Sequence, residues 1–98
     1  MLFSDKIFKI NRWNIKQERI LVLTVKAVYL FRRKSIYLSM LFYLDLRKKM
    51  MIDECACIIK ATNNNECILH APNAFDLRLQ CDRRDAFLDL LKLMFAKM

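Results

Sequence analysis

The spacing of the hydrophobic residues changes once along this chain, near residue 82. Before that point, short apolar runs alternate with polar breaks. Alternation is typical of β-strands, because successive strand residues point to opposite faces. After Asp82 the apolar residues recur at spacings of three and four, which predicts an amphipathic helix. They are Phe87, Leu90, Leu91, Met94 and Phe95, followed by Met98.

Seven strand-like runs precede this helix. Phe8 and Ile10 are expected on the buried face of the first run, and Lys9 on its solvent face. The basic clusters 32–34 and 47–49 are interpreted as polar breaks at loops. The predicted strands cover residues 5–11, 19–24, 27–31, 36–46, 56–61 and 67–71 and a short run around Leu77 and Leu79.

The chain contains no glycine, so its turns need another residue that tolerates left-handed backbone. Asparagine does so and also bonds its own main chain. Turns are predicted at residues 12–15 and 63–65, where asparagines gather, and at Val25-Lys26. Asp82 is the predicted N-cap of the helix, and Asp85 supplies an acidic first turn.

Seven strands followed by one amphipathic helix is the plan of the pleckstrin-homology (PH) fold. We therefore expect a single PH-like domain over residues 1–98, mainly β with one C-terminal α-helix. Its strands would form a partly open barrel or sandwich that the helix caps. A spanning helix needs about 20 apolar residues, and no run approaches that length. With no convincing signal peptide, a cytoplasmic location and free thiols at Cys55, Cys57, Cys67 and Cys81 are expected.

Positive charge is concentrated in the first half of the chain. The formal net charge is +8, yet residues 1–49 alone carry 12 of the 18 basic and three of the 10 acidic residues. Such a half attracts anionic lipid head groups, nucleic acid or an acidic protein. Nucleic acid is not the expected partner, because surface aromatics do not interleave with the cations and no reading helix is evident.

No enzyme, cofactor or metal site is expected. The sequence has no glycine-rich phosphate loop and no nucleophile with a base beside it. His70 stands alone in a strand pattern, without an evident acidic or thiol neighbour, and a structural role is predicted for it. Cys55 and Cys57 are expected on one face as small buried thiols, because their spacing does not suit zinc.

Residues 3–31 resemble the opening of the class I myosin tail homology 1 region. The family pattern Arg-x-Leu-x-Leu-Thr-x-x-Ala-x-Tyr is matched here by Arg19, Leu21, Leu23, Thr24, Ala27 and Tyr29. Residues 66–70 and 84–91 resemble later parts of that region. The resemblance implies a non-enzymatic, PH-like module that binds anionic phospholipids or phosphoinositides and links a myosin-I-tail-like cytoskeletal protein to the membrane.

The candidate lipid-binding residues surround the first predicted turn. The hairpin should return Lys16 and Arg19 beside Lys9, so that several cations converge on one polyanion. Trp13 would either enter the membrane interface or cap one end of the barrel. The full candidate set is Lys9, Arg12, Trp13, Lys16 and Arg19.

A second function stays open, that of a PH-like protein-interaction module in a cytoskeletal or ciliary assembly. Two features favour it. Residues 16–19 depart from the usual basic spacing of lipid-binding PH domains, since they include Glu18. The apolar run 36–44, if exposed at a sheet edge, would also suit a protein partner.

Overall fold

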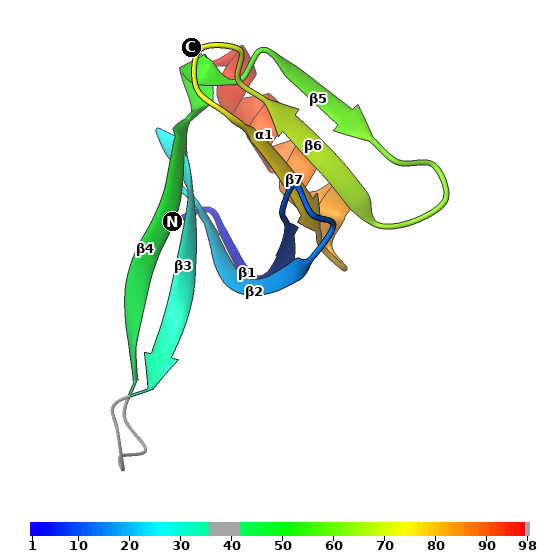
Figure 1. Cartoon of the computed structure of the whole chain (residues 1–98). Helices are drawn as coiled ribbons and strands as arrows, with labels where there is room; N and C mark the ends of the chain where they lie inside the picture. Colours follow the sequence, from blue (N-terminus) through cyan, green and yellow to red (C-terminus); the bar gives the residue numbers. More distant parts are fainter. Residues whose placement is uncertain (36–41, 98) are drawn as a thin grey trace.

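The computed structural model describes residues 1–35 and 42–97, and its strands form one open antiparallel sheet with a helix across one end (Figure 1). The strand order is β4-β3-β2-β1-β7-β6-β5, which confirms the predicted PH-like fold. The elements are β1 (Phe3–Ile10), β2 (Lys16–Leu23), β3 (Ala27–Ser35), β4 (Phe42–Met51), the 3-10 helix η1 (Ile52–Glu54), β5 (Cys57–Lys60), β6 (Glu66–His70), β7 (Asp76–Gln80) and α1 (Arg84–Ala96).

The core lies between the inner face of the sheet and α1. Leu21 of β2 and Leu77 of β7 are fully buried there. Phe87 of α1 packs on Phe3, with ring centroids 5.6 Å apart. Each such side chain contributes roughly 1.5–3 kcal/mol when fully buried. Within the described residues, no helix is long and apolar enough to cross a membrane.

The inward face of β1 differs from the prediction. Ile7 is 2% exposed and belongs to the core, whereas Phe8 is 40% exposed, so the expected burial of Phe8 is wrong. Ile7 and Phe8 are both apolar, so the sequence pattern alone allows either of them to face the core. The pairing of β1 with β2 places Ile7 on the same face as Leu21. Ile10 is buried elsewhere, beside Ile68 and the β1–β2 loop.

The β3–β4 hairpin is longer than predicted. The basic cluster 32–34 continues β3, and the cluster 47–49 lies inside β4, so the expected loops at both places are wrong. The outer part of this hairpin projects from the body of the molecule (Figure 1). Leu44 and Leu46 are about half exposed there. Projecting strands can hold consecutive charges because water reaches both faces. Residues 36–41 of the predicted fourth strand lie outside the described residues.

Short side chains close the turns as predicted. In the β1–β2 loop, Asn14 adopts a φ of 64°, in the left-handed region. The Asn11 side-chain oxygen accepts hydrogen bonds from the backbone amides of Trp13 and Ile15, at 2.9 and 3.0 Å. At the β2–β3 turn, the Thr24 hydroxyl accepts from the amide of Ala27. Asn14 thus fills a position that glycine often takes, whereas Thr24 closes its turn through hydrogen bonds alone.

Two details of α1 correct the prediction. The N-cap position is Arg83, and no described side chain caps the helix there, so Asp82 is not the cap. Asp82 instead accepts a hydrogen bond from the Asn65 side chain at 3.0 Å, which ties the β5–β6 turn to the start of α1. On the apolar face, Leu88 is buried whereas Phe95 is 47% exposed.

Candidate anion-binding site

The inner face of the sheet continues beyond the core toward the β1–β2 loop, and there its side chains are charged. Lys9 pairs with Gln17 across β1 and β2, and Arg19 follows Gln17 on the same face. β4 contributes Arg47 and Lys48, and the loop contributes Trp13. We call this the cationic hollow; its lining is Lys9, Asn11, Trp13, Gln17, Arg19, Arg47 and Lys48.

A β-bulge explains how two consecutive residues of β4 line one hollow. Leu30 pairs with Lys48 and Phe31 pairs with Leu46, which leaves Arg47 as an extra residue on β4. Regular alternation would send Arg47 and Lys48 to opposite faces. A bulge redirects the side chains beside it, so both cations reach the inner side. Lys48 also lies over the ring of Phe75, 4.8 Å from its centroid.

Positive charge in and beside this hollow exceeds the negative charge available to balance it. Arg32 of β3 lies close enough to influence Arg19. Asp45 is the acidic group beside these cations. Its Oδ2 lies 3.6 Å from Arg32 Nη2 and 3.4 Å from Arg47 Nη1. The cations of the cluster are Lys9, Arg19, Arg32, Arg47 and Lys48.

This crowding perturbs the two cations deepest in the hollow. Partial burial lowers the pKa of Lys9, and the charges of Lys48 and Arg19 lower it further. Burial also lowers the pKa of Arg19, with Arg47 and Arg32 adding to the effect. Burial and like charges both disfavour the charged form. A bound anion would relieve both effects.

The guanidinium groups retain hydrogen-bonding capacity. Arg19 donates from Nη1 to the backbone oxygen of Glu18 at 2.7 Å. Its Nε, like that of Arg32, is buried and has no hydrogen-bond partner among the described residues. A guanidinium can bind phosphate through two parallel N–H donors. The hollow therefore combines unbalanced charge with guanidinium groups, those of Arg19 and Arg47, whose geometry suits a phosphate or carboxylate.

The structure brings together three of the five predicted lipid-binding residues. Lys9, Trp13 and Arg19 line the cationic hollow. Lys9 lies on the core face rather than on the opposite, solvent-facing side, so that expectation is corrected. Lys16 is separated from Arg19 by three positions, and strand alternation therefore turns it to the other face. Arg12 stacks over the Trp13 ring at 4.2 Å and does not line the hollow.

The exposure of Trp13 contradicts one of the two roles considered for it, that of a cap on the barrel. Its side chain is 67% exposed, in the β1–β2 loop at the edge of the hollow. A tryptophan that capped the barrel would be largely buried. Trp13 is therefore free to contact a surface that approaches the hollow, but it contributes little to the core.

Arg32, Arg47 and Lys48 are missing from the set predicted from sequence. The basic clusters that contain them were expected at loops. Their contribution depends on the length of the β3–β4 hairpin and on its bulge. Consecutive charged residues carry no strand periodicity, so the pattern held no signal that would assign them to one face of a sheet.

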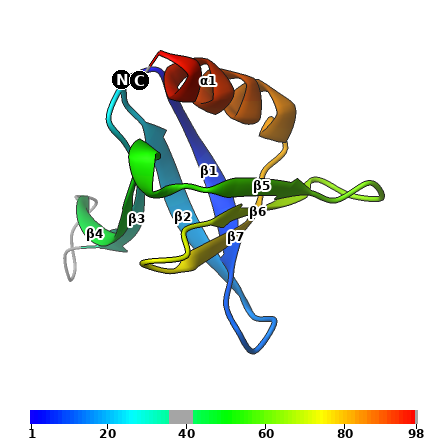
Figure 2. The ribbon, with the colours of Figure 1, turned by 90° about the horizontal axis from the view of Figure 1, so that it is seen from above.

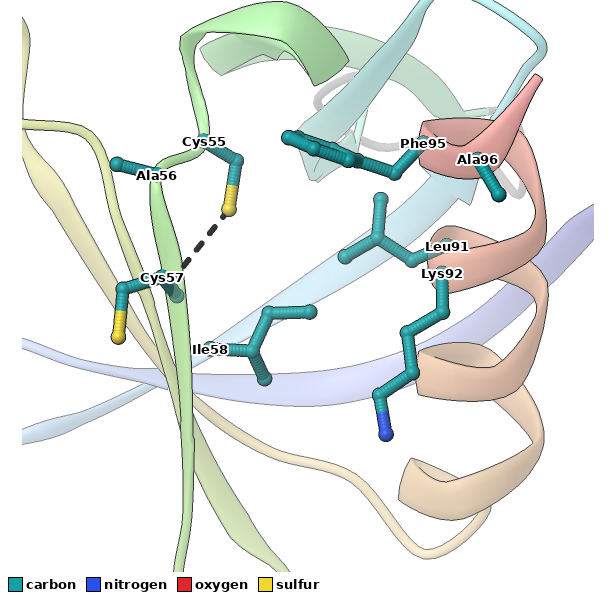
Figure 3. A pocket seen from close by; sticks show the side chains of 8 residues that line it. All are labelled: Cys55, Ala56, Cys57, Ile58, Leu91, Lys92, Phe95 and Ala96. Atoms are coloured by element: carbon teal, nitrogen blue, oxygen red, sulfur yellow. Dashed lines mark hydrogen bonds between the residues drawn. The ribbon is translucent and has the colours of Figure 1, made fainter. Parts of the chain in front are cut away.

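A second hollow lies between β5 and α1 (Figure 3). It is an apolar groove with Ile58, Leu91 and Phe95 among its lining and Lys92 at its rim. Cys55 is buried beside it and Cys57 is exposed, so the prediction that the two thiols share one buried face is wrong. Cys55 precedes β5 and does not follow the alternation of that strand.

Comparison with protein-family models finds no match for this chain, and comparison with curated proteins finds none either. The resemblance to the class I myosin tail homology 1 region therefore stays a prediction from the residues that carry it. The observations that bear on function are the PH-like fold, the cationic hollow and the apolar groove.

Proposed function

We propose that this chain is a non-enzymatic membrane-targeting module whose cationic hollow binds the head groups of anionic phospholipids or phosphoinositides. In a myosin-I-tail-like protein, such a module would attach a cytoskeletal element to the membrane as a peripheral, cytoplasmic domain. The observation that carries the proposal is the excess of partly buried cations in and beside the hollow, with Asp45 alone opposing them among the described residues of that cluster.

Phosphate oxygens fit this environment on physical grounds. They would accept hydrogen bonds from the guanidinium groups of Arg19 and Arg47, which line the hollow. They would also offset the repulsion that lowers the pKa of Lys9. Each cation near an anionic membrane surface is worth about 1 kcal/mol. Several cations that converge on one head group therefore give a useful affinity without an enclosed pocket.

Exposed aromatic and aliphatic side chains extend this surface. Trp13 stands at the edge of the hollow, and Tyr43 is exposed farther along β4. Tryptophan and tyrosine are favoured at the boundary between water and lipid, because their rings are amphipathic. A head group in the hollow would bring Trp13 to that boundary, so charge and apolar contact would act together.

Vesicle co-sedimentation tests the proposal with two charge-matched double variants. Lys9→Glu with Arg19→Glu changes the hollow by four charge units, and Lys92→Glu with Lys97→Glu changes α1 by the same amount. The β1–β2 loop and α1 lie at opposite ends of the molecule (Figure 2). The hollow variant should lose binding to phosphatidylserine-containing vesicles, whereas the helix variant should retain most of it. Equal losses would mean that only net charge is sensed.

Varying the salt concentration and the lipid head group makes the same assay more specific. Binding should weaken as ionic strength rises, because the screening length falls to about 8 Å at 0.15 M. Vesicles that carry phosphatidylserine or a phosphoinositide at equal total charge separate general attraction from recognition of a phosphorylated head group. Failure of the unaltered chain to bind either vesicle at low salt would contradict the lipid proposal.

The apolar groove favours the second candidate, a protein-interaction module. β5 is an end strand of the sheet, so its free edge can add an extended peptide beside the groove. An apolar peptide side chain would fill the groove between Ile58 and Phe95, and an acidic one would face Lys92. In a displayed peptide library, the unaltered chain should then enrich such sequences and Phe95→Ser should not. Equal enrichment by both would contradict this candidate.

A further inference from the structure

A row of three chemically reactive side chains crosses the outer face of the sheet, opposite the core. Cys57 of β5 pairs with His70 of β6, and His70 pairs with Asp76 of β7. Cross-strand partners point to the same face, and their Cβ atoms lie about 4.5–5.5 Å apart. The register therefore places a thiol, an imidazole and a carboxylate side by side, in that order.

The acid and the imidazole are already in contact. His70 Nδ1 lies 2.6 Å from Asp76 Oδ1. This corrects the expectation that His70 has no acidic or thiol neighbour. In a neutral imidazole, a proton held on Nδ1 by the carboxylate leaves the lone pair on Nε2. The hydrogen bond with Asp76 thus orients the ring and leaves its second nitrogen able to accept a proton.

Cys57 differs from the other three cysteines in exposure. Its side chain is exposed, whereas Cys55, Cys67 and Cys81 are free and buried. Burial raises the pKa of each of these three thiols, that of Cys67 to about 12. Figure 3 shows the Cys57 thiol directed away from the apolar groove. A reagent in solution can therefore reach Cys57 in the folded chain, while the buried thiols are shielded and hard to ionise.

We propose that Cys57 is a modification site for low-molecular-weight disulfides, with His70 as the base and Asp76 as a positioning residue. His70 Nε2 takes the thiol proton, and the Cys57 thiolate attacks one sulfur of the small disulfide. A new bond forms from Cys57 to that sulfur and the original S–S bond breaks. The departing thiolate takes the proton from the imidazolium, so the products are a mixed disulfide and one free thiol.

The charged neighbours of this row lie at its Asp76 end, where Arg12 and Arg78 line one hollow with Asp76. Arg78, the next outer-face residue along β7, bonds Glu66 and Asn14 at 2.9 and 3.0 Å. Ile59 and Ile68 form the adjacent row and carry no charge. Asp76 is consequently the acidic group that contacts His70 among the described residues. The row lies on the face opposite the cationic hollow, so the inference is independent of lipid binding.

The experiment follows the reaction of the native chain with oxidised glutathione at pH 7, by intact mass and peptide mapping. One adduct is expected on the folded chain, at Cys57, and none on Cys57→Ser. His70→Gln should react at least about fivefold more slowly, since only a few per cent of an unassisted thiol is ionised at that pH. Ile59→Gln, on the outer face of the same strand, is the matched control and should react at the rate of the unaltered chain.

Two rescue measurements separate chemistry from a purely structural role. Added imidazole should restore part of the rate of His70→Gln, which it would not do if His70 only supported the fold. Asp76→Asn should slow the reaction, and Asp76→Glu should recover part of it. If His70→Gln unfolds, the Asp76 pair still tests the inference. Equal rates for the unaltered chain and these variants, or an adduct on another cysteine first, would overturn it.

Discussion

The two ends of the sheet's inner face serve opposite purposes. Where α1 covers the sheet, Leu21 and Leu77 meet Phe87 and exclude water. Toward the β1–β2 loop, the same strands carry Lys9 and Arg19 instead of leucines. Burial stabilises the covered end, because apolar surface is removed from water. At the open end, desolvation and repulsion among the cations oppose folding.

Under the proposed function, the residues that stabilise the fold and those that bind the anion occupy different parts of the same strand. β2 passes from the proposed binding surface to the core between Arg19 and Leu21, two residues that share one face. Substitutions at the covered end should therefore change the free energy of unfolding first. Those at the open end should change binding first, and some of them should stabilise the chain.

The largest change in the free energy of unfolding is expected from a charged substitution in the core beneath α1. Leu91→Asp would place a charge among buried side chains of α1 and the sheet, at a cost of several kcal/mol. That is a large share of the 5–15 kcal/mol typical of a small domain. Thermal and urea unfolding should show loss of the cooperative transition, or a much lower midpoint.

Leu93→Asp is the matched control, since Leu93 is on the same helix and 49% exposed. It should change the free energy of unfolding by no more than about 0.5 kcal/mol. If Leu91→Asp melted like Leu93→Asp, α1 would not close the core.

Alkaline pH should also lower the free energy of unfolding, because the buried thiols of the covered end resist ionisation. In the folded chain the pKa of Cys67 is about 12, and those of Cys55 and Cys81 are also raised. Above pH 9 the unfolded thiols lose protons that the folded ones keep, so stability falls as pH rises. The slope approaches about 1.4 kcal/mol per unit for Cys67, and Cys55 and Cys81 add to it in the same direction. Urea unfolding at pH 8, 9 and 10 measures this.

At the open end, a rise in pH should have the opposite effect on stability. The pKa of Lys9 is lowered on folding, so its unfavourable charge is relieved as pH rises toward 10.5. The pKa shift of Cys67 is the largest of these, so the net change should be a loss of stability. Cys67→Ala should flatten the pH dependence. An unchanged slope in that variant would show that Cys67 is not the group responsible.

Much of the fold follows from local patterns in the sequence. The asparagine-rich turns, the alternation in β6 and β7, and the change of period at α1 all predict the elements that are present. The ends of elements are predicted less well, because Arg83 rather than Asp82 occupies the N-cap position. Helix boundaries depend on contacts such as the Asn65–Asp82 bond, which joins residues far apart in the chain.

The site is only partly predictable, for a different reason. Lys9, Trp13 and Arg19 come from one hairpin, whose pairing can be worked out from local sequence. Arg47 and Lys48 reach the hollow because of a β-bulge. The hydrophobic periodicity of the sequence does not reveal such a one-residue shift in register. The Cys57–His70 pair likewise depends on the register of β5 against β6.

A smaller effect is expected at the edge of the open end. Trp13 is the only tryptophan of the chain, so its fluorescence reports its surroundings directly. On addition of anionic vesicles its emission should shift to shorter wavelength, and zwitterionic vesicles should leave it unchanged. Trp13→Ala should weaken vesicle binding severalfold and change the free energy of unfolding by less than about 0.5 kcal/mol. Emission that stays unshifted while the chain sediments with vesicles would show that Trp13 does not enter the interface.

We propose that the hollow keeps its cations for anion binding at the expense of stability. The double variant Lys9→Met with Arg19→Met removes two partly desolvated charges and keeps long side chains. We predict that it melts roughly 2–5 °C higher than the unaltered chain, the change expected for a stabilisation below about 1 kcal/mol in a domain of this size. The same sample should no longer sediment with phosphatidylserine vesicles at low salt. A variant that melts lower and still sediments like the unaltered chain would contradict the claim.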